Sequence, residues 1–240
     1  MSLRSRNHLR LAGAVAIHVL TATGGVLGLF SLLSASNGQW TSSFAWLGAA
    51  LIVDGVDGPL ARMVDVKRVL PRFSGEELDH LVDYVTYVTV PAFMVARAEI
   101  VPEGLRLPLA AVIMLVSLYH FFESKTADGY FVGFPAIWNV VVLYCFVLGF
   151  QPAVSASIIA ICAVFTVIPL YWVHPLRVKR LRLLTLAVVS AWGAAAVSAI
   201  LGGFPGSPAE QVIFGLAAIY VIAIGVSARA GSDRHFDPVK

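Results

Sequence analysis

The chain has 240 residues, of which 58% are hydrophobic and only 13% are charged, and its formal net charge is +3. Charged residues make up about 25% of a typical soluble domain, so this composition excludes a soluble globular protein and indicates an integral membrane protein. The small positive charge does not indicate a nucleic-acid partner, because the basic residues lie in short loops between apolar segments, where they set topology and contact the head groups of membrane lipids.

Apolar segments follow one another along the chain, and each is long enough to cross a hydrocarbon core of about 30 Å. The predicted spans are residues 11–33, 42–62, 79–97, 105–122, 135–150, 153–173, 183–201 and 209–228. Only Gln151 and Pro152 clearly separate the fifth span from the sixth, so six or seven spans remain alternatives. The sequence therefore predicts an all-α protein, a polytopic membrane helical bundle of about eight transmembrane helices, which forms a single domain over residues 1–240.

The distribution of basic residues supports this count. With these spans, all but two of the 17 Lys and Arg residues fall on one side of the membrane, and the exceptions are Arg97 and Arg106. A miscounted span would scramble this alternation in every later loop. Because Lys and Arg accumulate on the cytoplasmic side, we expect both termini and the 62–78 loop to face the cytoplasm.

Four aspartates lie at the ends of two predicted spans, on either side of the basic 62–78 loop. Asp54 and Asp57 are three residues apart, and Asp79 and Asp83 are four apart, so each pair shares one helix face. At about 1.5 Å per residue, all four carboxylates lie within roughly two to three turns of the cytoplasmic surface. Two facing helices can therefore bring them together.

Carboxylates at this depth are costly unless positive charge lies beside them. Oxygen ligands suit hard cations such as Mg²⁺, Ca²⁺ or Mn²⁺, and two divalent ions would balance four carboxylates. Two such ions can hold a phosphate between an attacking and a leaving oxygen, so we expect phosphoryl transfer at the membrane. The alternative is that the acids form structural ion pairs with nearby arginines such as Arg62.

Small residues accompany the first acidic pair. Gly55, Gly58 and Ala61 leave room for a bulky ligand or for a close helix neighbour. Pro59 cannot donate to the carbonyl of Gly55, which predicts a kink beside the carboxylates and a carbonyl open to a metal or ligand. These features favour a binding site at this end of the span.

The same residues form a motif over residues 54–83. It reads Asp57-Gly58-x-x-Ala61-Arg62, twelve residues, Gly75-x-x-x-Asp79-x-x-x-Asp83, with Asp54 three residues before Asp57. The motif resembles the signature of the CDP-alcohol phosphotransferases, membrane enzymes that move a substituted phosphate from a cytidine diphosphate donor to an alcohol and release CMP. The spacer is longer than in most of that family, and with the chain length and span count it resembles the spacer of the bacterial phosphatidylcholine synthases.

This resemblance implies an enzyme of phospholipid biosynthesis that joins choline to CDP-diacylglycerol. It implies two divalent ions, Mn²⁺ or Mg²⁺, a place in the bacterial inner membrane with the active site facing the cytoplasm, and a possible homodimer. The implied metal ligands are Asp54, Asp57, Asp79 and Asp83, and Asp83 is also the implied catalytic base toward the acceptor hydroxyl.

The resemblance also implies that Gly58, Ala61, Arg62 and Gly75 shape the CDP-binding site. His18 and Thr21 share one face of the first span, where members of the family often carry polar residues toward the nucleotide, so Thr21 is added to this site. A hydrogen-bonded pair between helices is the alternative for these two residues.

Aromatic faces bind quaternary ammonium groups such as choline. The candidates are Tyr84, Tyr87, Tyr130 and Trp138, with Tyr84 preferred because it adjoins Asp83. Aromatic residues near the end of a span are otherwise typical of the interfacial belt.

Two alternative functions remain. The first is an enzyme of the same family with serine, glycerol 3-phosphate or inositol as acceptor, although the spans carry no basic residue at mid-depth for a phosphorylated acceptor. The second is a cation transporter, which the position of the acids at one membrane face disfavours, because transport sites usually lie near the midplane.

Overall fold

The computed structural model describes residues 3–122, 130–168, 171–173 and 181–232. The chain forms two compact units, Met1–Ala98 with Ile137–Asn139, and Glu99–Ala136 with Val140–Lys240.

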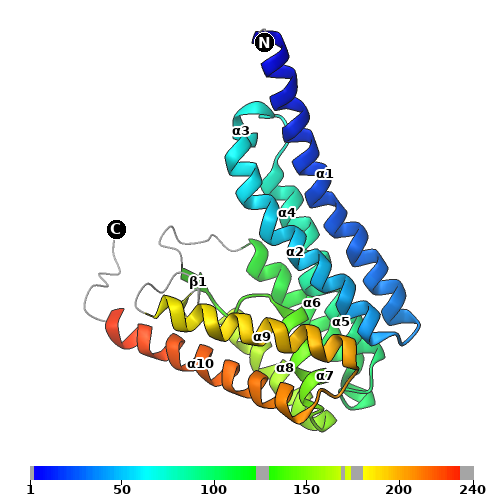
Figure 1. Ribbon diagram of the computed structural model, residues 1–240. Helices are drawn as coiled ribbons and strands as arrows, with labels where there is room; N and C mark the ends of the chain where they lie inside the picture. Colours follow the sequence, from blue (N-terminus) through cyan, green and yellow to red (C-terminus); the bar gives the residue numbers. More distant parts are fainter. Residues whose placement is uncertain (1–2, 123–129, 169–170, 174–180, 233–240) are drawn as a thin grey trace. The chain divides into compact units, whose positions relative to one another are not determined.

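All secondary-structure elements in the described part of the first unit are helices (Figure 1). Its elements are α1 (Leu3–Ser36), α2 (Trp40–Val64), α3 (Val66–Val69), α4 (Gly75–Asp83), the π-helix η1 (Tyr84–Thr89) and α5 (Val90–Arg97). The long helix α1 lies along α2 and also contacts α4, η1 and α5. It therefore forms the common wall against which both acid-bearing helices pack.

Glycines in α1 allow this close packing. A Cβ atom at Gly24 would lie 2.7 Å from Cγ1 of Val82, and one at Gly28 would lie 2.8 Å from Cγ1 of Val85. Both separations are shorter than real carbon contacts, so only glycine lets α4 and η1 approach α1 to this distance. The approach brings the acidic face of α4 close to α1 and α2.

The loop between α2 and α4 is short and defined by its caps. α2 continues past Pro59 and ends at Val64, and Asp65 then adopts the left-handed conformation with φ of 57°. At the start of α4, the side chain of Ser74 accepts a hydrogen bond of 3.2 Å from the backbone N–H of Glu77. A serine cap followed by glutamates in the first turn is a strong signal for a helix N-terminus. The caps determine where α2 ends and where α4 begins. They therefore also determine how the motif residues on the two helices face one another.

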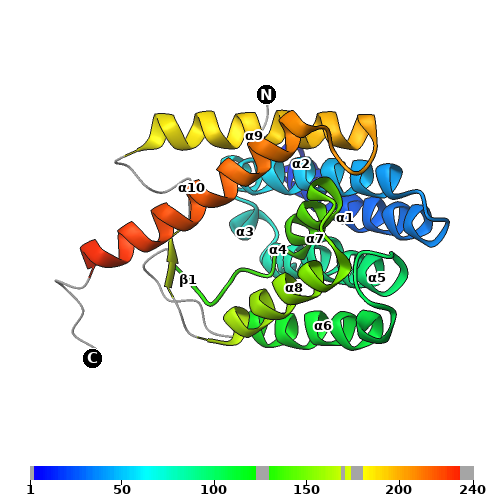
Figure 2. The same ribbon diagram turned by 90° about the horizontal axis from the view of Figure 1, so that it is seen from below.

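The second unit begins with the short 3₁₀ helix η2 (Glu103–Leu105). Its other elements are α6 (Arg106–Phe122), β1 (Tyr130–Val132), α7 (Trp138–Leu148, whose first two residues belong to the first unit), α8 (Pro152–Val167), β2 (Tyr171–Val173), α9 (Arg182–Gly202) and α10 (Pro208–Ser232). Helix α9 contacts α10, and α6 contacts α8 (Figure 2). The strands β1 and β2 pair antiparallel, with Tyr130 opposite Val173. These two three-residue strands were not predicted.

Each predicted span overlaps a helical segment, and the span at 79–97 comprises most of α4 with η1 and α5. The sixth span was predicted too long, because 153–173 is helical only as far as Val167 and ends in the strand β2. Among the described residues, four helical segments are long and apolar enough to cross a membrane, namely His8–Ser36, Trp40–Val64, Glu103–Phe122 and Arg182–Gly202. Apolar helices at Trp138–Leu148, Pro152–Val167 and Pro208–Ile224 are shorter. The predicted class, a polytopic helical membrane protein, is confirmed.

Large apolar side chains lie on the outer faces of these helices. Ile52 is 69% exposed, Leu183 84% and Leu201 82%. A soluble protein rarely leaves so many large apolar side chains in water. Lipid tails accept them without cost, which is consistent with helices that lie in a bilayer.

Candidate active site

The acidic cluster predicted from the motif forms in the first unit. Asp54 and Asp57 in α2 and Asp79 in α4 each offer a carboxylate oxygen, and these oxygens all lie within 4.8 Å of one another. Asp57 is buried and the other two are partly buried. Three carboxylate oxygens at this spacing fit a hard divalent cation, which prefers oxygen ligands.

Asp83 lies one turn beyond Asp79 in the same helix. It lines a small enclosed space together with the other three aspartates and with Thr21 and Thr86. It is not part of the group whose oxygens lie within 4.8 Å of one another. The structure thus places all four predicted aspartates around one space, with three of them in the tighter group.

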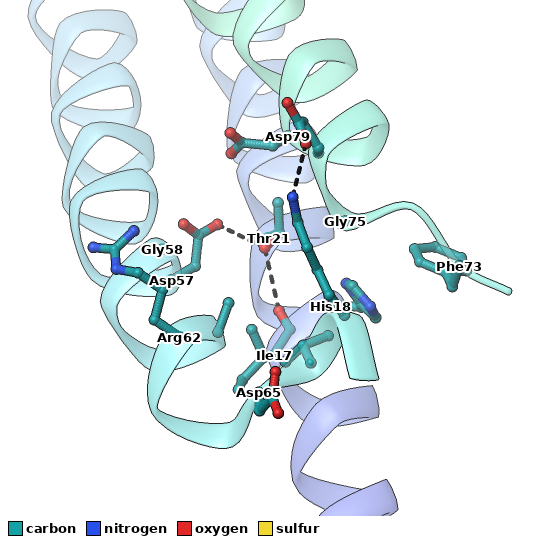
Figure 3. Close-up of a pocket in the computed structure, with 14 residues that line it drawn as sticks. Ile17, His18, Thr21, Asp57, Gly58, Arg62, Asp65, Phe73, Gly75 and Asp79 are labelled. Atoms are coloured by element: carbon teal, nitrogen blue, oxygen red, sulfur yellow. Dashed lines mark hydrogen bonds and ion pairs between the residues drawn. The ribbon is translucent and has the colours of Figure 1, made fainter. Parts of the chain in front are cut away.

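Thr21 in α1 holds the most buried acid. Its hydroxyl donates a hydrogen bond of 2.6 Å to Oδ2 of Asp57, and its oxygen also lies 3.2 Å from the backbone carbonyl of Ile17 (Figure 3). Thr21 and Asp57 are only 6% and 5% exposed. The sequence associated Thr21 with the nucleotide, and the structure shows that its hydroxyl contacts a candidate metal ligand.

Tyr87 makes a similar hydrogen bond to Asp54, the other acid of α2. Its phenol donates a hydrogen bond of 2.7 Å to Oδ2 of Asp54. Tyr87 belongs to η1, which follows α4 directly. The sequence predicts Tyr87 as a choline-binding residue and does not predict this contact, because Tyr87 and Asp54 lie far apart in the chain and no local pattern relates them.

The structural alternative for these acids was pairing with arginines. Among the residues that the structure describes, neither Asp54 nor Asp57 forms an ion pair with Lys or Arg. Arg62, the basic residue of α2, also has no carboxylate partner among the described residues. The negative charge of Asp54 and Asp57 is therefore open to a cation, which disfavours the ion-pair interpretation.

A cavity of about 400 Å³ opens beside the cluster, between the end of α2, the start of α4 and the middle of α1 (Figure 3). It has the size of a small-molecule site. All five residues that the sequence assigned to CDP binding line it, namely Thr21, Gly58, Ala61, Arg62 and Gly75. Asp57 and Asp79 line it as well, so the cavity adjoins the acidic cluster directly.

The structure adds residues that sequence reasoning did not assign to this cavity. The ring of His18 packs 4.4 Å, centroid to centroid, from the ring of Phe73, and a Cβ atom at Gly75 would lie 2.7 Å from Cε1 of His18. Nε2 of His18 is buried and has no hydrogen-bond partner among the described residues. The spacing of three between His18 and Thr21 was the only sequence signal for its position.

Lys67 and Glu76 also line the cavity, from α3 and from the first turn of α4. Their side chains form an exposed ion pair of 3.1 Å. An exposed pair of this kind stabilises a fold by less than about 1 kcal/mol. The ion pair between Lys67 and Glu76 can therefore open at little cost in stability when a charged ligand enters.

The predicted choline residues are not gathered in this cavity. Tyr84 and Tyr87 lie in η1, and Trp138 is fully buried, so none of the three lines the 400 Å³ space. The side chain of Tyr130 lies outside the described residues. Of these candidates, the structure places Tyr87 in contact with the acidic cluster.

The chain is similar to known proteins over most of its length. The family model for CDP-alcohol phosphatidyltransferase matches residues 14–228. A phosphatidylcholine synthase of Mesorhizobium japonicum is 43% identical over 183 residues, which are 75% of this chain and 68% of that protein. The phosphatidylcholine synthase of Agrobacterium fabrum is 39% identical over 214 residues, which are 88% of this chain and 89% of that protein. The phosphatidylcholine synthase of Pseudomonas aeruginosa is 40% identical over 190 residues, which are 78% of this chain and 80% of that protein.

Proposed function

The chain belongs to the CDP-alcohol phosphatidyltransferase family, and we propose that within this family it is a phosphatidylcholine synthase. It transfers the phosphatidyl group of CDP-diacylglycerol to choline and releases CMP. The observation that carries this proposal is the acidic cluster beside a nucleotide-sized cavity, in a chain about 40% identical to proteins named phosphatidylcholine synthase. Membership of an enzyme family also decides against the cation transporter.

Asp54, Asp57, Asp79 and Asp83 are proposed to hold two divalent ions, Mn²⁺ or Mg²⁺. The grouping of three oxygens within 4.8 Å supports this set, with Asp83 completing it from the next turn. Bound divalent ions stabilise the charge that develops on the transferred phosphate and on the leaving CMP. The protein's own contribution is to fix the carboxylates in place before substrate arrives.

The nucleotide half of the donor is proposed to occupy the 400 Å³ cavity. Arg62 supplies positive charge for the diphosphate, and Gly58 and Gly75 leave room for the nucleotide on opposite sides of the cavity. Nε2 of His18, buried without a protein partner among the described residues, gains one from a polar group of the donor. Lys67 is released from Glu76 as the donor enters.

Asp83 is proposed to act as the base. Its carboxylate takes the proton of the choline hydroxyl, and the hydroxyl oxygen forms a bond to the phosphorus that carries diacylglycerol. The bond from this phosphorus to the bridging oxygen of the diphosphate breaks, and its electron pair leaves with CMP. Tyr84, next to Asp83 in the chain, offers an aromatic face to the trimethylammonium group.

The orientation of the site follows from the basic residues of the 62–78 loop. Because Lys and Arg accumulate on the cytoplasmic side of bacterial inner membranes, the cavity opens toward the cytoplasm, where CDP and choline are soluble. A homodimer is the proposed assembly, but the site needs no second subunit, because all of its residues come from one unit of one chain.

The test is an acceptor panel with purified protein in detergent. CDP-diacylglycerol and Mn²⁺ are supplied with choline, ethanolamine, serine, inositol or glycerol 3-phosphate, and CMP and the lipid product are measured. We expect CMP release that depends on choline and a product identified as phosphatidylcholine. Turnover with serine, inositol or glycerol 3-phosphate and none with choline would overturn the acceptor and leave the family chemistry standing.

A further inference from the structure

Tyr87 makes a contact that the family motif does not explain. A role in a choline wall, meaning the set of aromatic side chains expected to bind the trimethylammonium group, does not explain it either. Its phenol donates 2.7 Å to Oδ2 of Asp54, one of the three acids whose oxygens lie within 4.8 Å of one another. A phenol donor leaves the other carboxylate oxygen free. It also adds no positive charge that would compete with a cation, whereas an arginine in the same place would.

The π-helix sets the direction of this side chain. Asp79, Asp83 and Tyr87 are spaced by four residues, and in an uninterrupted α-helix each such step turns about 40° past a full rotation. Tyr87 would then point roughly 80° away from Asp79. A π turn contains about one more residue than an α turn. Four residues from Asp83 to Tyr87 therefore rotate by less than a full turn, which cancels most of the 80° difference in direction.

A proline lies two residues after the π turn. Pro91 has no N–H, so the carbonyl of Tyr87, four residues before it, cannot receive the usual helical hydrogen bond. One residue earlier, the backbone N–H of Val90 donates to the carbonyl of Val85, five residues back and not four, and the hydroxyl of Thr89 reaches the carbonyl of Tyr84 at 3.2 Å. The residues before this proline therefore hold the π register that turns Tyr87 toward Asp54.

The bond from Tyr87 has a counterpart at the neighbouring acid. Thr21 donates 2.6 Å to Oδ2 of Asp57, from the opposite helix α1. Each acid of α2 thus receives one neutral donor, from a different helix, on its Oδ2 atom. Hydrogen bonds of this kind orient metal-binding carboxylates, and losing one typically costs about 10–100-fold in metal affinity.

We propose that Tyr87 is a positioning residue for the metal site, which the π-helix η1 directs onto Asp54. This role rests on the divalent-metal site proposed above, and it replaces the role of Tyr87 in a choline wall. The expected consequence of losing the phenol is weaker metal binding, with the choline site left intact. In the choline-wall interpretation, the aromatic ring matters and the hydroxyl does not.

The test is direct Mn²⁺ binding to the purified, substrate-free full chain, followed by the electron paramagnetic resonance signal of free Mn²⁺. Tyr87→Phe keeps the ring and removes only the hydroxyl. Tyr220→Phe is the matched control, because it removes a phenol from a hydrogen bond of the same length, 2.7 Å to Thr185, outside the acidic cluster. We expect the Mn²⁺ dissociation constant to rise about 10-fold or more in Tyr87→Phe and to stay unchanged in Tyr220→Phe.

A second measurement separates positioning from a contact with choline. At saturating Mn²⁺, the turnover of Tyr87→Phe should recover toward the wild-type value, with an unchanged KM for choline. Equal Mn²⁺ affinity in Tyr87→Phe and the wild type would overturn the positioning role. So would a raised KM for choline that Mn²⁺ does not restore. A wild-type chain that binds no Mn²⁺ would overturn the metal site itself, and with it this role.

Discussion

The hydroxyl of Thr21 in α1 donates a hydrogen bond of 2.6 Å to the carboxylate of Asp57 in α2, and both side chains are buried. The bond joins two helices at the point where the 400 Å³ cavity meets the acidic cluster, since both residues line this cavity and the space around the four aspartates. Thr21 therefore links the proposed donor site to the proposed metal site, and a change at this position tests the link.

Thr21→Val keeps the shape of the side chain and removes the hydroxyl. We expect weaker Mn²⁺ binding and a fall in kcat/KM of about 10-fold or more, because a buried carboxylate that loses its donor is destabilised by about 1–3 kcal/mol. Thr21→Ser restores the hydroxyl and should recover most of the loss. If Val and Ser variants behaved alike, the hydrogen bond would be irrelevant and only the volume of the side chain would matter.

Asp57→Asn should abolish transfer and also weaken Mn²⁺ binding. Asp57 is the most buried acid of the cluster, and its neutral replacement removes a charge that solvent cannot replace there. Glu103→Gln, an exposed change of the same kind in the second unit, is the control and should keep wild-type activity. Near-normal turnover of a folded Asp57→Asn protein would refute the metal-dependent mechanism.

Asp83→Asn is expected to separate donor binding from transfer. Asp83 lies outside the tighter group of three acids, so donor binding should largely survive. Loss of a general base typically lowers turnover by about 10²–10⁴-fold. Donor binding and turnover are measured on the same preparation, and an equal loss in both would make Asp83 a metal ligand only.

Gly75→Ala should raise the KM for CDP-diacylglycerol. The new Cβ would lie 2.7 Å from Cε1 of His18, so the imidazole must shift in the wall of the cavity that the donor is proposed to fill. Gly48→Ala is a matched control in α2, because its Cβ would meet no atom within 4 Å. Alanine there should leave KM unchanged and raise thermal stability slightly, since glycine in a helix costs about 0.5–1 kcal/mol relative to alanine. Unchanged kinetics in Gly75→Ala would place the nucleotide elsewhere.

Tyr84→Ala addresses the acceptor. If its ring binds the trimethylammonium group, the KM for choline should rise by a factor equivalent to about 1–2 kcal/mol, with the dependence on CDP-diacylglycerol largely intact. Choline should outcompete ethanolamine in the wild type, because the ammonium of ethanolamine must lose strongly bound water. Similar small changes for both substrates would instead indicate an interfacial tyrosine with no role in binding.

Several features could be predicted from local sequence. Hydrophobic segment lengths specify the helices, because a backbone in lipid must satisfy its own hydrogen bonds. The motif spacing specifies which faces of two helices carry Asp54, Asp57, Asp79 and Asp83, because the helical period is fixed. The cavity residues Gly58, Ala61, Arg62 and Gly75 follow from the same motif, and the structure places them around one space.

Other features depend on approaches between helices that no local pattern encodes. Phe73 against His18, and Lys67 against Glu76, are set by the path of the loop between α2 and α4. Trp138 was expected near the acceptor and lies fully buried. The strands β1 and β2 are too short to give an alternating pattern that would predict them.

By itself the sequence determined the class of the protein, its apolar helical segments and its four-aspartate motif, since length, hydropathy and helical period act over neighbouring residues. Only the tertiary structure decided which side chains orient those aspartates. The bonds from Thr21 to Asp57 and from Tyr87 to Asp54 join residues more than 30 positions apart. The first bond exists because α1 packs along α2, and the second because η1, which Gly28 lets approach α1 closely, directs the phenol of Tyr87 onto Asp54.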